Sequence, residues 1–532
     1  MTDIVPVRPS FTATRRQVLV GGAAAAAAGI SGIQAGSAQA ASSPAPAAKG
    51  STVDRATIQR WARDTWASMA ALAHPATGLP ADNLSGPLSS PTRSGYTSPT
   101  NIGGYLWSAV VAREMGIISA AECRTRLTQT LKTLSNMKTH KFSGMFYNWY
   151  DESNGNVVKI WPENGTQVDP FLSSVDNGWF AAALMTIRNA EPGVANLANV
   201  LLGRMNFGMF FDKDAGVGAG GLLRGGFWDV KPSGGFTKGN YLGIGPDVYY
   251  TNNRYDILVS EPRIATYIGI AHGQIPSKAY FATMRTFPDN WDWQEMKPVG
   301  VTRTYLGIDV FEGAYTYRGM HIVPSWGGDM FEALMPDLFV PEASWAPRSW
   351  GINHALTVRA QREHGLEDAR YGYWGFSPAS KPGGGYSEWG VDAIGMRPDG
   401  YPSDLERTNY YDGSYGSRSD GSSANPAWGD GVVTPHAAFL AMQYEPVEAY
   451  DNLVKVESVL KAYGEGGFYD AVAVKSGLIA KRYLSLDQAM ILGAIGNVFC
   501  DNVIRRNFIK DEIQATIKPL IGIEEFGAGV IV

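Results

Sequence analysis

Cysteine and histidine are scarce in this chain, which has two cysteines and seven histidines among 532 residues. Cys123 and Cys500 stand far apart in apolar, helix-like segments, which excludes a disulfide-rich fold. An exported location would permit one disulfide between them, and two buried thiols fit the sequence equally well. The histidines show no metal-ligand spacing such as H-E-x-x-H, so we expect no metal site and no cofactor.

An excess of basic residues is also lacking. The chain has 45 Lys and Arg against 50 Asp and Glu, a net charge of −5. This balance provides neither a basic patch for nucleic acid nor an acidic tail, so we expect no nucleic-acid partner. We also expect no stable membrane span in the mature chain, since no run of about 20 strongly apolar residues is present. The oligomeric state stays open at this level.

The first 51 residues form a segment of their own. Arg15 and Arg16 precede a weakly apolar Gly/Ala run that ends in an A-x-A-like site at Ala40. This order is typical of a twin-arginine export signal. A transmembrane anchor is the alternative, but the run is short and rich in Ala and Gly. We therefore predict an export signal at 1–40, an Ala/Pro/Ser linker at 41–51, a single domain at 52–532, and a secreted or cell-envelope location.

Glycine and aromatic residues, in contrast, are abundant, with 62 Gly, 15 Trp and 25 Tyr. The stretch FSGMFYNWYD at 142–151 puts five aromatic rings, an amide and a carboxylate into ten residues. Its spacing does not fit an amphipathic helix. A large aromatic core would account for part of this content, and a loop-rich enzyme with a cleft lined by aromatic rings would account for the polar groups among the rings.

Helical periodicity dominates the chain after residue 51. It predicts about a dozen helices joined by loops rich in Gly, Pro, Asn and Asp, with the following segments: 58–72, 127–137, 180–187, 197–205, 264–271, 278–284, 330–335, 350–363, 435–443, 447–462 and 486–505. Strand-like alternation is clear only at 302–317, which predicts a small β-hairpin. We predict an all-α fold, an (α/α)6 toroid or barrel whose loops converge on a cleft at one end. An α-solenoid is the alternative, but no fixed internal period is present.

Acidic residues recur beside aromatic residues or at helix starts. They are Asp151 in FYNWYD, Asp176 in SSVDNGW, Glu261 in SEPRIA, Asp430 in AWGDG and Asp487 in YLSLDQ. Aromatic faces stack on the C–H faces of sugars, and two carboxyls beside a glycosidic bond supply the acid and the base for its hydrolysis. The pattern therefore favours a glycoside hydrolase.

Each of these acids also has a structural interpretation. Asp176 and Asp487 precede helix-like runs and fit N-caps. Glu261 could form a surface ion pair with Arg254 or Arg263. Asp151 could close a turn. These alternatives stay open on the residues alone.

Eight motifs together resemble the glycoamylase-like proteins, the α/α-barrel domains of bacterial endo-β-1,2-glucanases and cyclic β-1,2-glucan synthases. In chain order they are TSPTNIGGYLWSAVVAREMGII, FYNWYD, SSVDNGWFAAAL, YDILVSEPRIATYIGIAHGQIP, MFEALMP, YGYWGFSPAS, DGVVTPHAA and YLSLDQAMIL. The resemblance extends over residues 97–508. It implies an α/α-barrel and an enzyme that acts on a polysaccharide or oligosaccharide.

The resemblance also implies roles for individual residues. SEPRIA is similar to the segment that carries the general acid, which points to Glu261. SSVDNG and YLSLDQ are similar to segments that bring Asp176 and Asp487 to the site, and YNWYD brings Asp151. Which of Asp151, Asp176, Asp430 or Asp487 acts as the base stays open. We expect the sugar to be bound by polar and aromatic residues of these motifs: Tyr147, Asn148, Trp149, Trp179, Arg263, Trp374 and Asp430.

One departure bears on the mechanism. Where the cyclic-glucan synthases have Trp-Gly-Ile-Ser followed by a glutamate that resembles a retaining nucleophile, this chain has WGFS followed by Pro378. Proline cannot act as a nucleophile, so we expect inversion. Glu388 in the nearby YSEWG could replace the missing carboxylate and reverse this expectation. An insertion at about 287–321 also departs from the family, and it leaves sugar identity and linkage open.

The sequence thus predicts an exported glycoside hydrolase that cleaves a β-glucan, with β-1,2 linkages as the leading choice. Two alternatives are kept. One is a non-catalytic carbohydrate-binding protein on a decayed hydrolase fold, which Pro378 motivates. The other is an enzyme of the same fold that acts on another cell-wall glycan.

Overall fold

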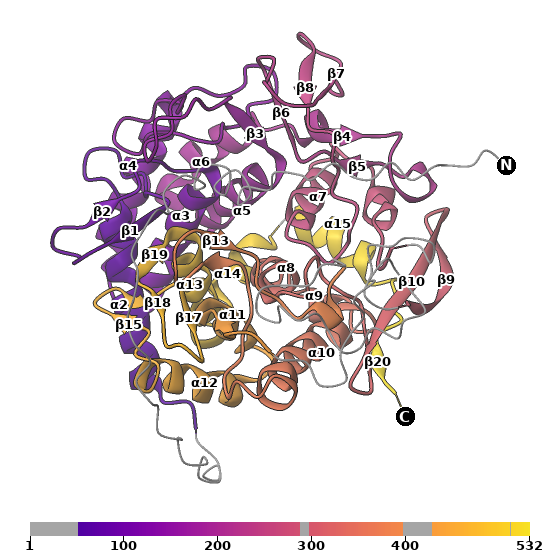
Figure 1. Ribbon diagram of the computed structural model, residues 1–532. Coiled ribbons are helices and arrows are strands. Elements are labelled where there is room, and N and C mark those ends of the chain that lie inside the picture. The colour runs from indigo at the N-terminus through magenta and orange to yellow at the C-terminus, as the bar shows by residue number, and fades with distance from the viewer. Residues whose placement is uncertain (1–51, 288–296, 397–427, 511, 532) are drawn as a thin grey trace.

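Six helices pack side by side in a closed circle within the residues that the computed structural model describes, 52–287, 297–396, 428–510 and 512–531 (Figure 1). These inner helices are α3 (Pro99–Glu114), α5 (Ser174–Ala190), α7 (Arg263–Ala271), α8 (Met330–Leu334), α11 (Pro435–Ala441) and α13 (Ser485–Phe499). Each contacts the next, and α13 returns to α3. The α7–α8 step is made by Arg263, whose guanidinium donates to the carbonyls of Glu332 and Ala333. This arrangement of helices is compatible with a helical barrel.

A second helix packs against each inner helix from outside. In the same order these outer helices are α4 (Ala120–Asn136), α6 (Ala195–Leu202), α15 (Glu512–Ile521), α10 (Trp350–Glu363), α12 (Pro446–Ser458) and α2 (Arg55–Leu72). Short helices α9 (Glu342–Trp345) and α14 (Val503–Phe508) fill in between them. The outer helices bury one face only, as the five buried positions of α4 show. Amphipathic outer helices around apolar inner ones place the core between the two layers.

Segments that connect the helices form small antiparallel sheets. Two of them have four strands: β3 (Phe171–Ser173), β6 (Gly226–Trp228), β8 (Val248–Tyr250) and β7 (Thr237–Gly239) in one, and β20 (Gly529–Val530), β11 (Met320–Ile322), β10 (Ile308–Tyr317) and β9 (Val299–Tyr305) in the other. The other strands form shorter ladders: β1 (Asn83–Ser85), β2 (Thr92–Arg93), β4 (Phe211–Asp212), β5 (Leu222–Leu223), β12 (Ala379–Ser380), β13 (Tyr386–Ser387), β14 (Val432–Val433), β15 (Tyr463–Gly464), β16 (Gly467–Phe468), β17 (Ala471–Ala473), β18 (Ile479–Ala480) and β19 (Arg482–Leu484). The predicted hairpin is confirmed as β9 and β10.

Most predicted helices are confirmed, and two expectations need correction. The segment predicted at 278–284 is a 3-10 helix, Ser277–Ala282, not an α-helix. The long helix predicted at 486–505 is two helices, α13 and α14. Asp501 and Asn502 both have φ of 51° there, a left-handed conformation that ends α13. Their short polar side chains tolerate this conformation better than apolar ones, which a periodicity pattern does not register.

Several further expectations concern the termini and the cysteines. The predicted signal at 1–40 and the linker at 41–51 lie outside the described residues. No helix in the described ranges combines the length and the apolar character needed to cross a membrane. Cys123 and Cys500 do not pair; both are free thiols.

Candidate active site

The N-terminal ends of the inner helices meet at one end of the assembly. Thr100 of α3 donates from Oγ1 to Oδ1 of Asp176 in α5 at 2.6 Å. One turn further along α5, Trp179 donates from Nε1 to Oε2 of Glu261, which precedes α7, at 2.8 Å. The backbone N–H of Glu261 donates to Oε2 of Glu332 in α8 at 2.6 Å. Hydrogen bonds thus connect the starts of four inner helices.

The WGF motif and Asp82 complete this circle of contacts. The carbonyl of Phe376 accepts from the first residue of α8, and the carbonyl of Gly375 accepts from Thr434, which precedes α11. Asp82 joins α13 to α3. Its Oδ1 accepts from Asn101 of α3 at 2.8 Å, and its carbonyl accepts from Ser485 of α13. The predicted motifs therefore converge, although they span about 400 residues of sequence.

Three acids stand at the third position of inner helices. They are Asp176 in α5, Glu332 in α8 and Asp487 in α13. The N-cap interpretation of Asp176 is wrong, because Ser173 is the cap and its hydroxyl accepts from the Asp176 N–H. Asp487 is likewise inside α13 rather than at its cap. Helix N-termini carry partial positive charge, so they stabilise carboxylates in the first turn.

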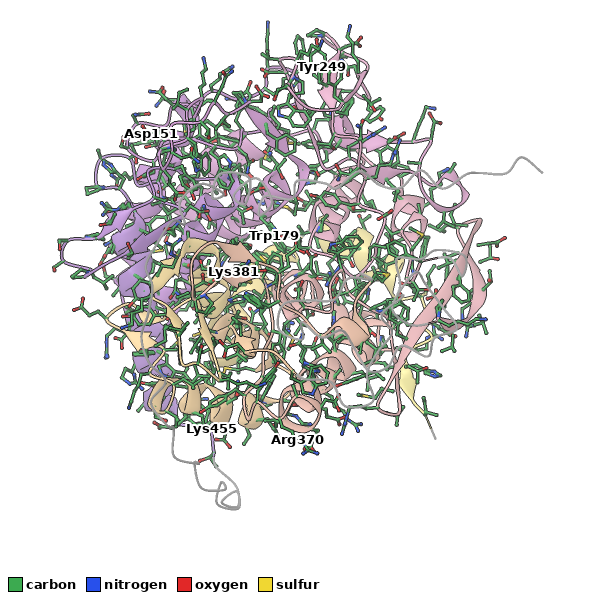
Figure 2. The ribbon with its side chains drawn as sticks, viewed as in Figure 1. Asp151, Trp179, Tyr249, Arg370, Lys381 and Lys455 are labelled. Carbon is green, nitrogen blue, oxygen red and sulfur yellow. The ribbon has the colours of Figure 1, made fainter. Side chains whose placement is uncertain are left out.

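Glu261 differs from these acids in its exposure. It lies in the turn before α7 and is partly exposed, whereas Asp176 is 0% and Asp487 2% exposed. Trp179 is fully buried, and its indole N–H orients the Glu261 carboxyl. Figure 2 shows Trp179 near the middle of the circle of helices. A partly exposed, oriented carboxyl can exchange a proton with a bound molecule.

The pKa of the Tyr255 hydroxyl is affected by the acids around Glu261. Burial raises the pKa of its hydroxyl well above the usual value, and the negative charges of Glu261, Asp176 and Glu332 raise it further. The phenol therefore stays protonated and can donate a hydrogen bond to one of these carboxylates. The sequence analysis did not single out Tyr255.

A second acidic group surrounds Asp487. His436, at the second position of α11, has Nδ1 3.4 Å from Oδ2 of Asp487. Asp470 lies beside them, and its Oδ2 accepts from the N–H of Ser380 at 2.9 Å. Burial raises the pKa of Asp470 well above its usual range, and the charge of Asp487 and a hydrogen bond to it add to this effect. These effects favour the protonated form of Asp470, which can donate a hydrogen bond to Asp487.

The loop with Pro378 lies beside this group. Strand β12 pairs with β13 in a register of Ala379 with Ser387 and Ser380 with Tyr386. One residue beyond this register, Pro378 stands opposite Glu388. The sequence alternative that Glu388 replaces the missing glutamate thus has a structural basis in strand pairing.

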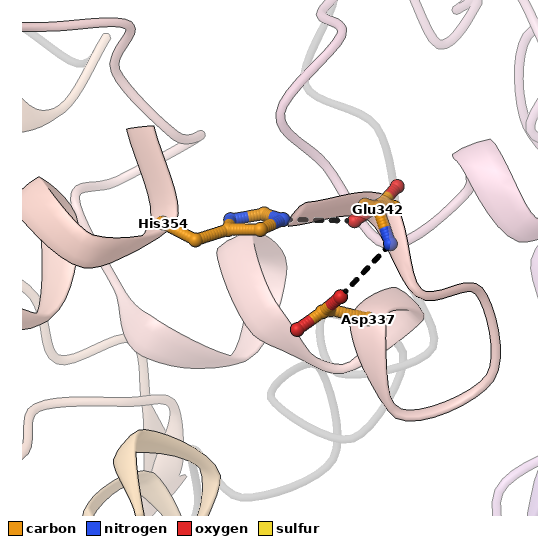
Figure 3. Close-up of side chains that lie close together, drawn as sticks. All are labelled: Asp337, Glu342 and His354. Carbon is orange, nitrogen blue, oxygen red and sulfur yellow. Dashed lines mark hydrogen bonds and ion pairs between the residues drawn. The ribbon is translucent and has the colours of Figure 1, made fainter. Parts of the chain in front are cut away.

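Arg263, which the sequence assigned to sugar binding, pairs in this structure with a carboxylate of its own chain. It is 5% exposed, and it forms a two-pronged ion pair with Glu342 at 2.8 and 2.9 Å. Glu342 also accepts from Tyr267 and contacts Nε2 of His354 at 2.9 Å (Figure 3). Burial opposes ionisation of Glu342, but the charge and hydrogen bonds of Arg263 and the bond from His354 outweigh it and lower the pKa of its carboxyl. This network joins the Glu261 turn to α8, α9 and α10.

Within the part of the chain that the structure describes, two groups of side chains have the spacing of metal ligands. The donor atoms of Asp337, Glu342 and His354 lie within 4.8 Å of one another (Figure 3). There, however, Arg263 and Arg505 bind the carboxylates, and two guanidinium groups would repel a cation. The same spacing holds for His436, Asp470 and Asp487. Metal ligands must be deprotonated, and the raised pKa of Asp470 disfavours its deprotonated form, so this group suits proton sharing better than coordination.

The aromatic stretch at 142–151 packs against the acid end, and four of its five rings are buried, whereas Phe142 is partly exposed. Tyr147 is 1% exposed, and its hydroxyl donates to Oδ2 of Asp229 at 2.6 Å. Asn148 is 3% exposed. Trp149 is enclosed in a small cluster with Tyr96 and Trp161. The predicted stacking faces are therefore not available to a sugar in this conformation.

Other predicted site residues also have structural surroundings. Trp374 is 2% exposed and lies in the main core, where it offers no free face. Both oxygens of Asp151 accept hydrogen bonds within its own turn, from Ser153 and Asn154. Both oxygens of Asp430 accept from Ser476, which lies 46 residues away in the turn between β17 and β18. These aspartates hold turns in the structure.

The sequence analysis did not single out Thr100 or His436 for the site. Each follows a proline at the first helical position, in Ser98-Pro99-Thr100 and in Thr434-Pro435-His436. Proline there marks a helix start, so this signal could have placed both at the acid end. Asp470 has no such signal, because it follows a two-residue strand far from the helices in sequence.

Comparison with known protein families and structures gives partial matches. The Glycoamylase family model, described as “Putative glucoamylase”, matches residues 301–512. A family of unknown function, DUF3131, matches residues 60–220. Cyclic beta-(1,2)-glucan synthase NdvB of Rhizobium meliloti (strain 1021) is 24% identical over 87% of this chain, which spans 18% of the length of that protein.

Solved structures share the fold. The endo-beta-1,2-glucanase from Chitinophaga pinensis has a TM-score of 0.58 at 16% identity, over 88% of this chain and 98% of that one. The beta-1,2-glucanase from Parabacteroides distasonis has a TM-score of 0.60 at 15% identity, over 87% of this chain and 59% of that one. The resemblance seen in the motifs is thereby confirmed: the chain matches the Glycoamylase family over residues 301–512 and shares the fold of endo-β-1,2-glucanases.

Proposed function

We propose that this protein is a glycoside hydrolase that cleaves a β-glucan, with β-1,2 linkages, on an (α/α)6 toroid. Glu261 donates a proton to the glycosidic oxygen in this proposal. The observation that carries it is the Glu261 carboxyl, partly exposed and oriented by Trp179 where the inner helices begin. The named activity of the structural neighbours supports the substrate class.

Asp487 is our choice for the base that activates water by an inverting mechanism. Asp151 and Asp430 have both carboxylate oxygens engaged in turns. Asp176 and Asp487 are similarly buried, but Oδ1 of Asp176 is engaged by the hydroxyl of Thr100 at 2.6 Å. Asp487 adjoins His436, whose Nδ1 lies 3.4 Å from Oδ2 of Asp487 and can take up the proton removed from water. Asp487→Asn should therefore abolish hydrolysis, and an active Asp487→Asn protein would move the role to Asp176.

A retaining mechanism is the second candidate, favoured by the position of Glu388 opposite Pro378. Glu388 would then be the nucleophile, with a covalent glycosyl-enzyme intermediate. Glu388→Gln would then lose activity, and the released sugar would keep its anomeric configuration. Inversion predicts the opposite anomer and an active Glu388→Gln protein.

A panel of linkage-defined glycans, followed by NMR of the first anomer released, tests these proposals together. Release of reducing ends from linear β-1,2-glucan alone would support the full proposal. Turnover of another glycan would support the alternative of a different polymer. Binding without turnover over long incubation would support a non-catalytic carbohydrate-binding protein.

We also propose that residues 1–40 direct export by the twin-arginine route. Arg15 and Arg16 in the signal pattern support this proposal. Replacing both with Lys should retain the protein inside the producing cell, as cell fractionation would show. Unchanged export of the double variant would count against this route.

A further inference from the structure

A row of aromatic side chains crosses the sheet β3–β6–β8–β7. The strand register places Phe171 beside Trp228, and Trp228 beside Tyr249. Neighbouring strands lie about 4.8 Å apart, so the three rings extend over about 10 Å on one face. Phe236 extends this aromatic row, with its ring centroid 4.9 Å from that of Tyr249.

The aromatic row is on the solvent side of the sheet. Phe171, Trp228 and Tyr249 are each partly exposed. The row beneath, on the other face, is Leu172, Phe227 and Tyr250, and all three are 0% exposed. The lower face therefore secures the sheet to the core. The upper face does not pack against the core, and its aromatic side chains remain partly exposed to water.

Charged groups flank the aromatic row on both sides. Asp229 follows Trp228 and accepts from the hydroxyl of Tyr147. Lys238 stands opposite Tyr249 in the register and pairs with Asp247 at 3.7 Å. A face for another protein's apolar core would be depleted of charge at its centre, whereas Lys238 stands within this row, directly opposite Tyr249. Rings beside carboxylates and ammonium groups suit a ligand with alternating C–H faces and hydroxyls, which is the chemistry of a sugar chain.

The aromatic row lies away from Glu261 but is connected to its surroundings. Figure 1 shows β7 and β8 projecting from the body, and Figure 2 shows Tyr249 at the periphery while Trp179 lies near the middle. Strand β3 runs directly into α5, which carries Asp176 and Trp179. The backbone N–H of Asn148, in the aromatic stretch, donates to the carbonyl of Phe171.

We propose that this aromatic row is a second glycan-binding surface, which holds a distant part of a polysaccharide chain while another part occupies the active site. The class of ligand rests on the proposed function. The ligand's pyranose rings stack on Trp228 and Tyr249, and its hydroxyls contact Asp229 and Lys238. The surface contributes affinity for long chains and leaves the turnover of short oligosaccharides unchanged.

The test is affinity electrophoresis in gels containing linear β-1,2-glucan, with Glu261→Gln as the parent so that the polymer is not consumed. The double variant Trp228→Ala/Tyr249→Ala should bind the polymer about tenfold more weakly, since each aromatic contact is worth about 0.5–1.5 kcal/mol. Phe311→Ala is the matched control. Phe311 is a 37% exposed aromatic residue on β10 of the other four-stranded sheet, and its loss should change nothing.

The same substitutions in the active chain separate this inference from the proposed function. Trisaccharide turnover should match the unsubstituted protein, while KM for the long polymer rises. The inference would be overturned if the double variant were retained by the polymer as strongly as the Phe311→Ala control. It would also be overturned if the Glu261→Gln parent were not retained at all, even if the active chain hydrolyses the polymer. Row-dependent retention without hydrolysis of any glucan would support the inference and refute the proposed function. If circular dichroism shows that the double variant is unfolded, Tyr249→Ala alone tests the inference. This single variant should weaken polymer retention about threefold.

Discussion

The hydrogen bond from Trp179 to Glu261 is the residue-scale contact on which catalysis depends in our account. Trp179→Phe keeps an aromatic ring, removes the N–H donor to Glu261 and leaves part of the buried indole volume empty. Loss of one hydrogen bond to a charged group costs about 1.5–3 kcal/mol, so we expect kcat to fall by about 10- to 100-fold with little change in KM. Steady-state kinetics on the glucan would measure both values.

Trp107→Phe is the control for this prediction. Trp107 is as buried as Trp179, and its Nε1 donates to the carbonyl of Ala489 rather than to a catalytic group. It should cost stability but leave kcat unchanged. Equal losses of kcat in both variants would show that Trp179 acts through packing alone.

Asp470 offers a prediction about pH. Its folded-state pKa is raised above the ordinary value of 3.8 by burial and by the neighbouring Asp487. The stability from this group is therefore complete below about pH 3.8 and is lost as pH rises through the raised pKa. Asp470→Asn cannot ionise, so its free energy of unfolding should decline less than that of the unsubstituted protein between pH 4 and pH 8. Urea titrations at several pH values would measure this, and parallel declines would contradict the shared proton.

At the scale of elements, the pair Arg263–Glu342 holds the Glu261 turn against α8 and α9. Both side chains are nearly or fully buried. Removing one charge of a buried pair leaves the other charge buried and unpaired. Glu342→Gln should therefore lower the free energy of unfolding by about 3–5 kcal/mol. Denaturant unfolding would measure the loss.

Glu525→Gln is a matched control for that prediction. Glu525 also pairs with an arginine, Arg348, at 2.7 Å, but its side chain is 34% exposed and that of Arg348 60%. A pair that water screens contributes about 1 kcal/mol or less. A Glu342→Gln protein as stable as the Glu525→Gln protein would mean that the buried network does not hold these elements together.

Sequence pattern predicted the outer helices better than the inner ones. The segment 350–363 was predicted with the bounds of α10, and 58–72 lies within α2. The inner helix α3 was not predicted as a helix, because its buried positions run without interruption from Pro99 to Ala112 and leave no polar face. Periodicity reveals a helix only where one side meets water.

Sequence motifs predicted only part of the candidate site. Motifs identified Glu261, Asp176 and Asp487, which the structure gathers at one end of the inner helices. Arg263 and Trp374, assigned to the sugar from the same motifs, are instead buried in the protein. An arginine that binds a carboxylate of substrate and one that binds a carboxylate of its own chain are identical in sequence, and only the partner's position distinguishes them.

For the whole molecule, a third buried cluster predicts how stability responds to pH. Arg285 faces two buried carboxyls, Glu312 of β10 and Glu524 near the C-terminus. Burial raises the pKa of Glu312 to about 8, against the pull of Arg285, and the charge of Glu524 adds to the rise. Stability from this group is complete below about pH 4.5 and is lost as pH rises toward 8. Glu312→Gln should flatten this decline, as thermal unfolding from pH 5 to pH 9 would show; an unchanged slope would contradict it.

The central claim is that Glu261 protonates a glycosidic bond at the end of a closed circle of helices. The measurement that tests it most directly is reducing-end release from linear β-1,2-glucan by the unsubstituted protein and by Glu261→Gln, with the thermal midpoint and polymer binding of both. We predict hydrolysis by the unsubstituted protein and a rate about 10²- to 10⁴-fold lower in the variant, with its fold and binding intact. An equal rate in Glu261→Gln would contradict the account.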